Sequence, residues 1–450
     1  MSTLPDTFLG DLQSIVGDDQ VITKQNTLQH GSRDCYWFSP VLKAQLDDKV
    51  ADVIVRPSTV EQLVDVIALA VKERVPITPH GAGTGNYGQA VPLQRGLIIN
   101  TKNLNSILEL TPNYARVQAG VILHTIELEA RNVGAELRFF PSTLPTATAG
   151  GFLAGGSGGV GSITWGNLWD EGNVLGATVV TIEDTPQIIT LSGPEALQSI
   201  IHNCGLTCII ADLTFALAPV QPWQQYVVAF DTFEQALRFG EQLAYDEAVA
   251  KRLITAVEWP VPTYFKQLMR ADACPEGKSL LFLHLTLQPD EVQLKAQAAG
   301  GLVTWHSPQA SLHKRGIELT DFTWNHTTLW AIKADPQMTY LQDSFDPQRL
   351  YEQLRLRKDR YGDTIYEHIE FMKSGGEIRP AGLSLVRYQG KDHLWELMEY
   401  CESIGIVIAN PHTTYLDEDV RWNGQPILDA KARWDPYTLL NPGHLKALEK

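Results

Sequence analysis

Two glycine-rich stretches, about 70 residues apart, restrict the fold of this chain more than any other feature of its sequence. The first, PHGAGTGNYGQA at residues 79–90, has four glycines within residues 81–88. The second, TATAGGFLAGGSGGVG, has seven glycines in the twelve residues 150–161, where average usage predicts about one. Because glycine loses more conformational entropy on folding than other residues, such stretches are expected where the main chain approaches something closely. Two of them, each beside short predicted strands, indicate one long ligand between two lobes.

The first stretch matches G-x-G-x-x-G at Gly83, Gly85 and Gly88, the pattern of dinucleotide-binding Rossmann loops. In a Rossmann loop a helix begins directly after the glycines and points its N-terminus at the pyrophosphate. Here QAVPLQRG follows, and Pro92 together with the missing helical periodicity argues against a helix. The stretch instead predicts a turn of inward-pointing N–H groups that binds an anion, with a hydroxyl from Thr84. A glycine-rich turn without a ligand is the alternative.

Length and charge limit the class of protein. A chain of 450 residues predicts two or three domains, and a net charge of −16 disfavours nucleic acid and anionic lipid as partners. The sequence shows neither a signal peptide nor an apolar run long enough for a membrane span, so a cytoplasmic protein is expected. Cys204 and Cys208 have no second pair and no histidine at zinc spacing, which favours buried, reduced thiols over a metal site.

Strand and helix patterns alternate along the chain. Residues 52–79 predict a strand, then a helix with Ser58 as its N-cap and Glu61 three residues on, then a strand that runs into the first glycine stretch. After Pro222 the pattern changes to apolar strands alternating with helices, the first of them beginning at Asp231. We therefore expect an N-terminal helical segment at 1–47, a ligand-binding domain at 48–221, a second domain at 222–410 and a C-terminal arm at 411–450.

Four ordered motifs resemble one known family. VRPSTVEQLVDVIALAVKERVPITPHGAGTGNYGQA, FFPSTLPTATAGGFLAGGSGG, VLGATVV and DPYTLLNPG are together similar to the FAD-binding domain of the vanillyl-alcohol oxidase / p-cresol methylhydroxylase (PCMH) family, most of all its glycolate-oxidase-subunit-D-like flavoproteins. The resemblance covers residues 48–221 and 430–445. It implies an α+β fold in which two subdomains hold FAD, an α+β cap with an antiparallel sheet covers the flavin, and the C-terminal arm returns to the FAD domain.

The resemblance also implies which residues contact the cofactor. The first motif would surround the pyrophosphate, the second would approach the flavin, and the strand at 209–210 and the C-terminal arm would complete the site. The residues carried over are Gly81, Ala82, Gly83, Thr84, Gly85, Gln89, Ala90, Ser142, Thr148, Gly150, Gly151, Ser157, Gly158, Ile209, Ile210 and Asn441.

Some positions depart from the family pattern. His80 stands where the family commonly has Arg, and Thr84 stands where covalent members have the histidine that bonds the flavin. FAD is therefore expected to be bound non-covalently. His80, which is also assigned to the cofactor, is the alternative residue for a covalent bond to the flavin. Cys208 and Ala211 replace a Gly and a Thr of the third motif. The metal-binding motif of some members is missing from the cap, so no metal is expected.

The resemblance gives least guidance on the catalytic residues of the cap. Candidates for these residues come from three segments of the sequence. TDFTWNHTTLWAIK carries His326, GGEIRPAGLSLVRY carries Arg379 and Arg387, and IANPHTTYLDE carries His412 and Tyr415. One of the histidines could act as a general base, and one of the arginines could hold a substrate carboxylate. The alternatives are a hydrogen-bonded structural imidazole for each histidine and an ion pair for each arginine.

The first functional hypothesis is an FAD-dependent oxidoreductase that oxidises an alcohol or 2-hydroxy acid by hydride transfer to flavin N5 and passes the electrons to oxygen, a quinone or another acceptor. The second is a flavin-binding electron-transfer or assembly subunit of a larger complex. A protein without a cofactor is the third.

Overall fold

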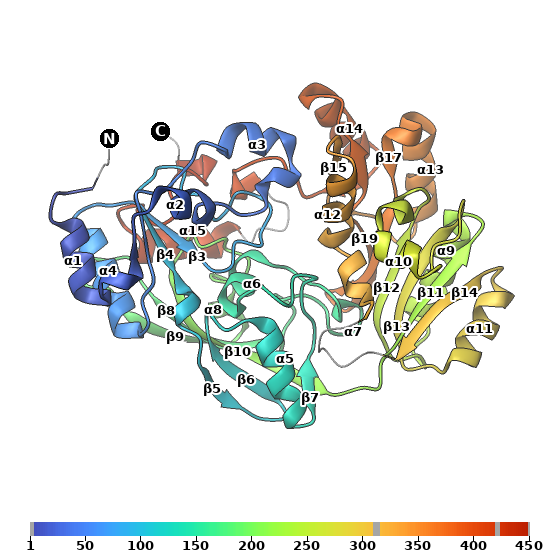
Figure 1. Ribbon diagram of the computed structural model, residues 1–450, viewed down its shortest axis with the longest axis horizontal. Helices are drawn as coiled ribbons and strands as arrows, with labels where there is room; N and C mark the ends of the chain where they lie inside the picture. The colour runs from blue at the N-terminus through green and yellow to red at the C-terminus, as the bar shows by residue number, and fades with distance from the viewer. Residues whose placement is uncertain (1–3, 309–315, 419–423, 449–450) are drawn as a thin grey trace.

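The computed structural model describes residues 4–308, 316–418 and 424–448 and shows an α+β fold (Figure 1). Its first sheet has the order β1-β2-β4-β3, with the last three strands parallel and β1 antiparallel to β2. These strands are β1 (Val21–Ile22), β2 (Val53–Val55), β3 (Ile77–His80) and β4 (Leu97–Asn100). The segment between β3 and β4 consists of turns and irregular backbone and contains no helix. This confirms that the first glycine-rich stretch is not a Rossmann loop.

Helix α4 (Val60–Lys72) packs on this sheet and buries Leu63, Val66, Ile67 and Ala70. Its N-cap is Thr59, whose side-chain oxygen accepts from the Gln62 N–H at 3.2 Å, so the prediction of Ser58 was wrong by one residue. The same correction applies to α9 (Phe233–Tyr245), which Thr232 rather than Asp231 caps. In both cases two neighbouring residues have a side chain that could cap the helix. The threonine is the N-cap because it has the extended backbone conformation that this position requires.

The second subdomain is an antiparallel sheet of order β5-β6-β10-β8-β9, with β7 paired to β10. Its strands are β5 (Ile107–Leu110), β6 (Tyr114–Gln118), β7 (Ala135–Leu137), β8 (Val174–Val180), β9 (Ile188–Ser192) and β10 (Ile209–Pro219). Its helices are α5 (Leu123–Asn132), α6 (Ala149–Gly155), α7 (Ser162–Trp165) and α8 (Pro194–Leu197). The second glycine-rich stretch therefore begins in a short helix and continues as a loop.

The cap contains an eight-stranded sheet of order β14-β11-β13-β12-β18-β19-β16-β21 and a smaller one of order β15-β20-β17. Its strands are β11 (Gln224–Phe230), β12 (Lys251–Val257), β13 (Ser279–Leu285), β14 (Leu302–Pro308), β15 (Met338–Tyr340), β16 (Asp343–Ser344), β17 (Ile365–Tyr366), β18 (His368–Ser374), β19 (Glu377–Gly382), β20 (Leu385–Arg387) and β21 (Val407–Ile408). Its further helices are α10 (Lys266–Arg270), α11 (Pro289–Ala298), α12 (Asn325–Ala334), α13 (Leu350–Tyr361) and α14 (Lys391–Ser403).

The two chain ends both lie in the lobe that contains the first sheet, where the blue and red segments lie side by side in Figure 1. The N-terminal helices are α1 (Phe8–Val16), α2 (Gln25–Gly31) and α3 (Pro40–Leu46), and the last helix is α15 (Gly424–Trp434). Beyond α15 the chain pairs with β3, since the Ile77 N–H donates to Leu439 O at 2.8 Å and the Asn441 N–H donates to Ile77 O at 2.7 Å. The predicted fold class, including the returning arm, is confirmed, while the exact domain boundaries stay predictions.

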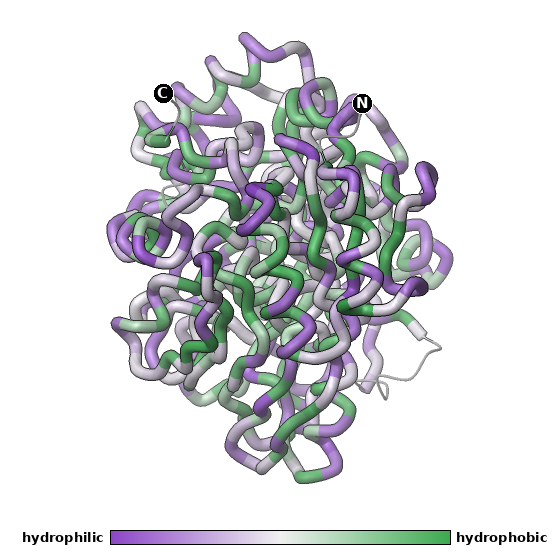
Figure 2. Tube along the Cα trace, turned by 90° about the vertical axis from the view of Figure 1, so that its left-hand side faces the viewer, coloured by the Kyte–Doolittle hydropathy of each residue, from purple (hydrophilic) through white to green (hydrophobic). Residues whose placement is uncertain are grey.

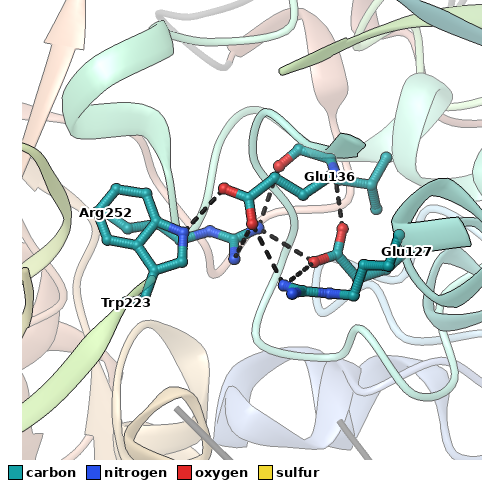
Figure 3. Close-up of polar contacts among 6 residues, drawn as sticks. Glu127, Glu136, Trp223 and Arg252 are labelled. Carbon is teal, nitrogen blue, oxygen red and sulfur yellow. Dashed lines mark hydrogen bonds and ion pairs between the residues drawn. The ribbon is translucent and has the colours of Figure 1, made fainter. Parts of the chain in front are cut away.

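Hydrophobic and hydrophilic segments alternate along the chain (Figure 2). One cluster of buried apolar residues surrounds the first sheet, a second lies mostly within the cap, and the third runs continuously from the second subdomain into the cap. The lobes meet at a buried group of charges (Figure 3). Arg252 of the cap strand β12 lies 3.5 Å from a carboxylate oxygen of Glu127 and 3.4 Å from one of Glu136. It also donates to Leu137 O at 3.1 Å, while the Trp223 indole N–H donates to Glu136 at 2.8 Å. This cluster attaches the cap to the second subdomain.

Candidate functional site

A cavity of about 480 Å³ lies where the two glycine-rich stretches meet the cap. One wall comes from the two subdomains and carries most of the residues assigned to the cofactor from sequence. The lining includes His80, Gly81, Ala82, Gly83, Thr84, Gly85, Gln89, Ala90, Ser142, Thr148, Gly150, Gly151, Ser157, Gly158, Ile209 and Ile210. The structure thus brings together residues that span about 130 positions of the chain.

The glycines in this wall have neighbours too close for a side chain. A Cβ added at Gly81 would lie 2.3 Å from Thr148 Oγ1, so the first stretch touches the second directly. A Cβ at Gly150 would lie 2.6 Å from that of Ala119, because the Gly150 N–H donates to Ala119 O at 2.8 Å and brings the α6 backbone against the end of β6. Gly83 and Gly88 have φ of 67° and 73°, which other residues rarely adopt.

Hydrogen bonds hold the loop between β3 and β4 in shape. The Cys35 N–H donates to Gly85 O at 2.6 Å, and the Tyr87 N–H donates to Gln89 Oε1 at 2.8 Å. Beneath the loop, Asp34 accepts from the N–H groups of Tyr36 at 2.8 Å and Ala90 at 3.3 Å. Burial raises the pKa of Asp34 to about 7. Sequence reasoning missed Asp34, because nothing in its surroundings along the chain marks it as a support of a loop that begins 47 residues later.

Asn167 is a second residue that sequence reasoning missed, and it tests whether this wall fits FAD. It lines the cavity and is 1% exposed, yet neither Oδ1 nor Nδ2 has a hydrogen-bond partner among the described residues. Its main chain is held, since its N–H donates to Asp170 Oδ2 at 2.7 Å and its carbonyl accepts from Asn173 Nδ2 at 2.8 Å. A buried amide without partners is costly, and a polar ligand in the cavity would satisfy it. Bare main chain plus this amide fits a long polar cofactor such as FAD.

Two of the residues assigned to the cofactor have particular positions. Asn441 is not part of the cavity lining. Its Nδ2 donates to Gln89 O at 2.7 Å and to Cys204 O at 3.0 Å, so it stabilises the loop between β3 and β4 from outside the cavity. His80 lies in the wall with Nδ1 3.0 Å from Gly81 O and Nε2 3.3 Å from Arg33 O. Burial lowers the pKa of His80, which favours its neutral ring.

The opposite wall belongs to the cap and consists of side chains from several strands and one helix. Arg379, predicted from sequence, lines the cavity and pairs with Glu377 at 2.9 Å while remaining 43% exposed. Sequence reasoning did not assign the remaining residues of this wall to the site, although Trp324 and Asn325 belong to the segment TDFTWNHTTLWAIK. They are Trp324, Asn325, Gln342, Asp343, Ser344, Met372, Ser374, Ala381, Gly382, Leu383, Val407 and Ala409.

The two predicted histidines of the cap lie outside the cavity lining. His412 is fully buried, with Nδ1 2.8 Å from Ser39 Oγ and Nε2 2.9 Å from Tyr340 O, and burial lowers its pKa to about 4. His326 has Nδ1 3.9 Å from an Asp321 carboxylate oxygen, and burial lowers its pKa to about 4 as well. Both arrangements correspond to the structural alternative considered from sequence, in which the imidazole joins parts of the fold.

The other two cap candidates also lie outside the lining. Arg387 pairs with Asp335 at 2.9 Å, and Tyr415 has the Lys446 ammonium 5.8 Å from its ring centre. Within residues 4–308, 316–418 and 424–448, no group of three His, Cys, Asp or Glu side chains is arranged to hold a metal ion. None of the helices in that part of the chain is both long and apolar enough to cross a membrane.

Comparisons with known proteins agree with the geometry. Residues 51–190 match a family model described as an FAD binding domain. A D-lactate dehydrogenase of Archaeoglobus fulgidus is 25% identical over 204 residues, which cover 43% of this chain and 44% of that protein. The glycolate oxidase subunit GlcD of Bacillus subtilis is 22% identical over 435 residues, which cover 88% of this chain and 89% of that protein.

A solved structure of an alkyldihydroxyacetonephosphate synthase has the same fold, with a TM-score of 0.74 at 16% identity over 99% of this chain and 87% of that one. The match to the D-lactate dehydrogenase, in contrast, spans less than half the length of that relative. The family model contains both glycine-rich stretches, and the structural likeness extends over the cap. Residues 51–190 therefore form an FAD binding domain, FAD is the cofactor, and the chain as a whole is similar to PCMH-type FAD-binding oxidoreductases.

Proposed function

We propose that this protein is an FAD-dependent enzyme that oxidises the CH–OH group of a 2-hydroxy acid or alcohol. The observation that carries the proposal is the two-sided cavity, which has a main-chain wall suited to a cofactor and a side-chain wall with the Arg379 guanidinium suited to a substrate. When bound, FAD would supply the acceptor for the substrate's hydride. The names of two relatives, a D-lactate dehydrogenase and a glycolate oxidase subunit, support a hydroxy acid.

The chain's own residues would bind and orient both molecules. The segments 81–90 and 150–158 would hold FAD through main-chain N–H groups, and Asn167 would add an amide. Non-covalent attachment is supported by Thr84, which has no ring nitrogen to bond the flavin, and by the close carbonyl neighbours of both His80 nitrogens. Arg379 would bind the substrate carboxylate through two parallel N–H groups. We assign no general base, because His412 and His326 lie outside the cavity lining.

The test is anaerobic reduction of the flavin. We expect the yellow holoprotein to lose its visible absorbance with glycolate, lactate or a larger 2-hydroxy acid, and Arg379→Met to raise the apparent Kd of the acid about tenfold or more. Arg387→Met is the matched control, since Arg387 also lies on a cap strand in an ion pair of 2.9 Å but outside the cavity lining. Unchanged absorbance with hydroxy acids, alcohols and phenols would refute the proposal.

The second candidate is a flavin-binding electron-transfer or assembly subunit. One observation favours it: the B. subtilis relative is named as a subunit of glycolate oxidase. It predicts a holoprotein that no small substrate reduces directly but that a reduced partner protein does. The electron acceptor, whether oxygen, a quinone or another carrier, and the proposed cytoplasmic location do not affect this distinction. Recolouring of the bleached protein in air would identify oxygen as an acceptor.

A further inference from the structure

The turn at Trp324 and Asn325 is an unusual part of the cap wall. Trp324 has φ 50° and ψ −143°, a left-handed conformation that is rare for a bulky side chain and easy only for glycine. Such strain persists where the surrounding structure imposes it, and it is concentrated at functional sites. Both residues line the cavity, so the strained turn lies where a substrate would bind under the proposed function.

A buried carboxylate holds this turn in place. The Trp324 N–H donates to Glu370 Oε1 at 2.7 Å, and the other oxygen of Glu370 accepts from Thr255 Oγ1 at 2.5 Å. His368 Nε2 lies 2.9 Å from Glu370 Oε1. Glu370, Thr255 and His368 are all buried in strands β12 and β18, so the core of the cap determines the position of the turn. The main chain of the turn is therefore held by a rigid support.

The two side chains carry polar atoms that nothing in the described part of the protein satisfies. Trp324 Nε1, a donor, and Asn325 Oδ1, an acceptor, are both buried and without a hydrogen-bond partner among the described residues. Leaving such a group buried and unpaired destabilises the protein. A ligand that carries both an acceptor and a donor, such as the carboxylate and hydroxyl of a 2-hydroxy acid, would supply a partner for each atom.

Part of the cap wall is apolar. Met372, Leu383 and Val407 line the same wall, and Leu383 belongs to the cluster of buried residues against which Trp324 packs. Glycolate has no side chain and lactate has a single methyl group, so neither would cover these surfaces. Each CH₂ group that a larger substrate buries here strengthens binding.

We propose that Trp324 and Asn325 are the specificity determinants of this enzyme and that its substrate is a 2-hydroxy acid with an apolar side chain larger than methyl, a step that rests on the proposed function. The indole N–H donates to the substrate's carboxylate, and the Asn325 amide oxygen accepts from its hydroxyl. Met372, Leu383 and Val407 contact the apolar side chain. Arg379 supplies the positive charge to the same carboxylate.

The experiment compares binding of unreactive acids to the oxidised holoprotein with flavin reduction by the matching hydroxy acids. Titration by the change in flavin absorbance is expected to show 4-methylpentanoate binding at least tenfold more tightly than acetate. Trp324→Phe, which loses the indole N–H, is expected to weaken 4-methylpentanoate about tenfold while FAD affinity stays unchanged. Asn325→Ala is expected to raise the apparent Kd of 2-hydroxy-4-methylpentanoate in flavin reduction, with little effect on 4-methylpentanoate, which lacks the hydroxyl.

Trp330→Phe is the matched control, because Trp330 lies in the same helix α12 but outside the cavity lining, and its Nε1 donates to Asp321 O at 2.6 Å. Reduction of the flavin by small and large hydroxy acids with equal affinity, unaffected by Trp324→Phe and Asn325→Ala, would overturn this inference and leave the proposed function standing. A flavin that no hydroxy acid reduces, and that binds neither unreactive acid, would overturn both.

Discussion

The two walls of the cavity are built in different ways. The FAD-side wall is mostly main chain, with Gly81 and Gly150 so close to their neighbours that a Cβ would collide. The cap wall is mostly side chains, with Trp324 and Arg379 presented by a helix and a strand that are separated in the chain by more than 40 residues. A wall made of main chain can be recognised from a short stretch of sequence, because such close packing requires glycine. A side-chain wall depends on which strands become neighbours in the folded protein.

This contrast predicts that substitutions in the cap and its attachment reduce stability, while those in the glycine wall mainly reduce cofactor affinity. The largest effect is expected at Arg252. Arg252→Met leaves Glu127 and Glu136 buried with less compensation, and we expect the free energy of unfolding to fall by about 3–5 kcal/mol. Urea unfolding of the holoprotein measures this change.

The control for Arg252 is Arg238→Met, which breaks an exposed pair with Glu234 at 2.7 Å on α9. Exposed pairs contribute about 0–1 kcal/mol, so its unfolding curve should lie close to that of the wild type. If both variants lose the same small amount, the buried cluster does not hold the cap to the FAD domain as we infer.

The second effect is a pH dependence at His412. Its folded-state pKa of about 4 lies below the unfolded value of about 6.5, so as the pH falls from 6.5 to 4 the unfolded chain binds a proton that the folded protein does not. The wild type should lose about 3 kcal/mol of stability over this range from His412 alone. His412→Gln, measured by urea unfolding at several pH values, should show a correspondingly flatter slope. An unchanged slope would mean that His412 is not buried as a neutral ring.

The third effect concerns the glycine wall. Gly150→Val would push α6 away from Ala119, and we expect the Kd for FAD to rise about a hundredfold, or ~2.7 kcal/mol, in titrations of the apoprotein followed by flavin fluorescence. Gly10→Ala in α1 is the control, since no heavy atom lies within 4 Å of its added Cβ. Normal FAD affinity in the Gly150 variant would contradict the main-chain wall.

The smallest effect is expected at Asn167, where a substitution should weaken FAD binding without reducing the stability of the apoprotein. Asn167→Leu removes an amide that has no partner among the described residues, so the apoprotein should be as stable as the wild type or slightly more stable. FAD should nevertheless bind about tenfold more weakly, which is ~1.4 kcal/mol. A destabilised apoprotein with normal FAD affinity would show that Asn167 has a purely structural role.

The sequence identified more residues of the main-chain wall of the cavity than of its cap wall. Sixteen residues assigned to the cofactor line one cavity, because their motifs are local and carry glycines. His412 was chosen because it follows a strand, but its ring meets Ser39, 373 residues away in the chain, and no local pattern reveals that contact. In TDFTWNHTTLWAIK we predicted His326 as a candidate general base, whereas its neighbours Trp324 and Asn325 line the cavity.

By itself the sequence determined that this is an α+β protein with two glycine stretches around a large cofactor, because close approach of main chain to a ligand demands glycine at specific positions. Tertiary structure alone decided which cap side chains face that cofactor. A strand presents its residues to alternating faces, and which face meets the cavity depends on the pairing and packing of distant segments such as β16, β19 and β21.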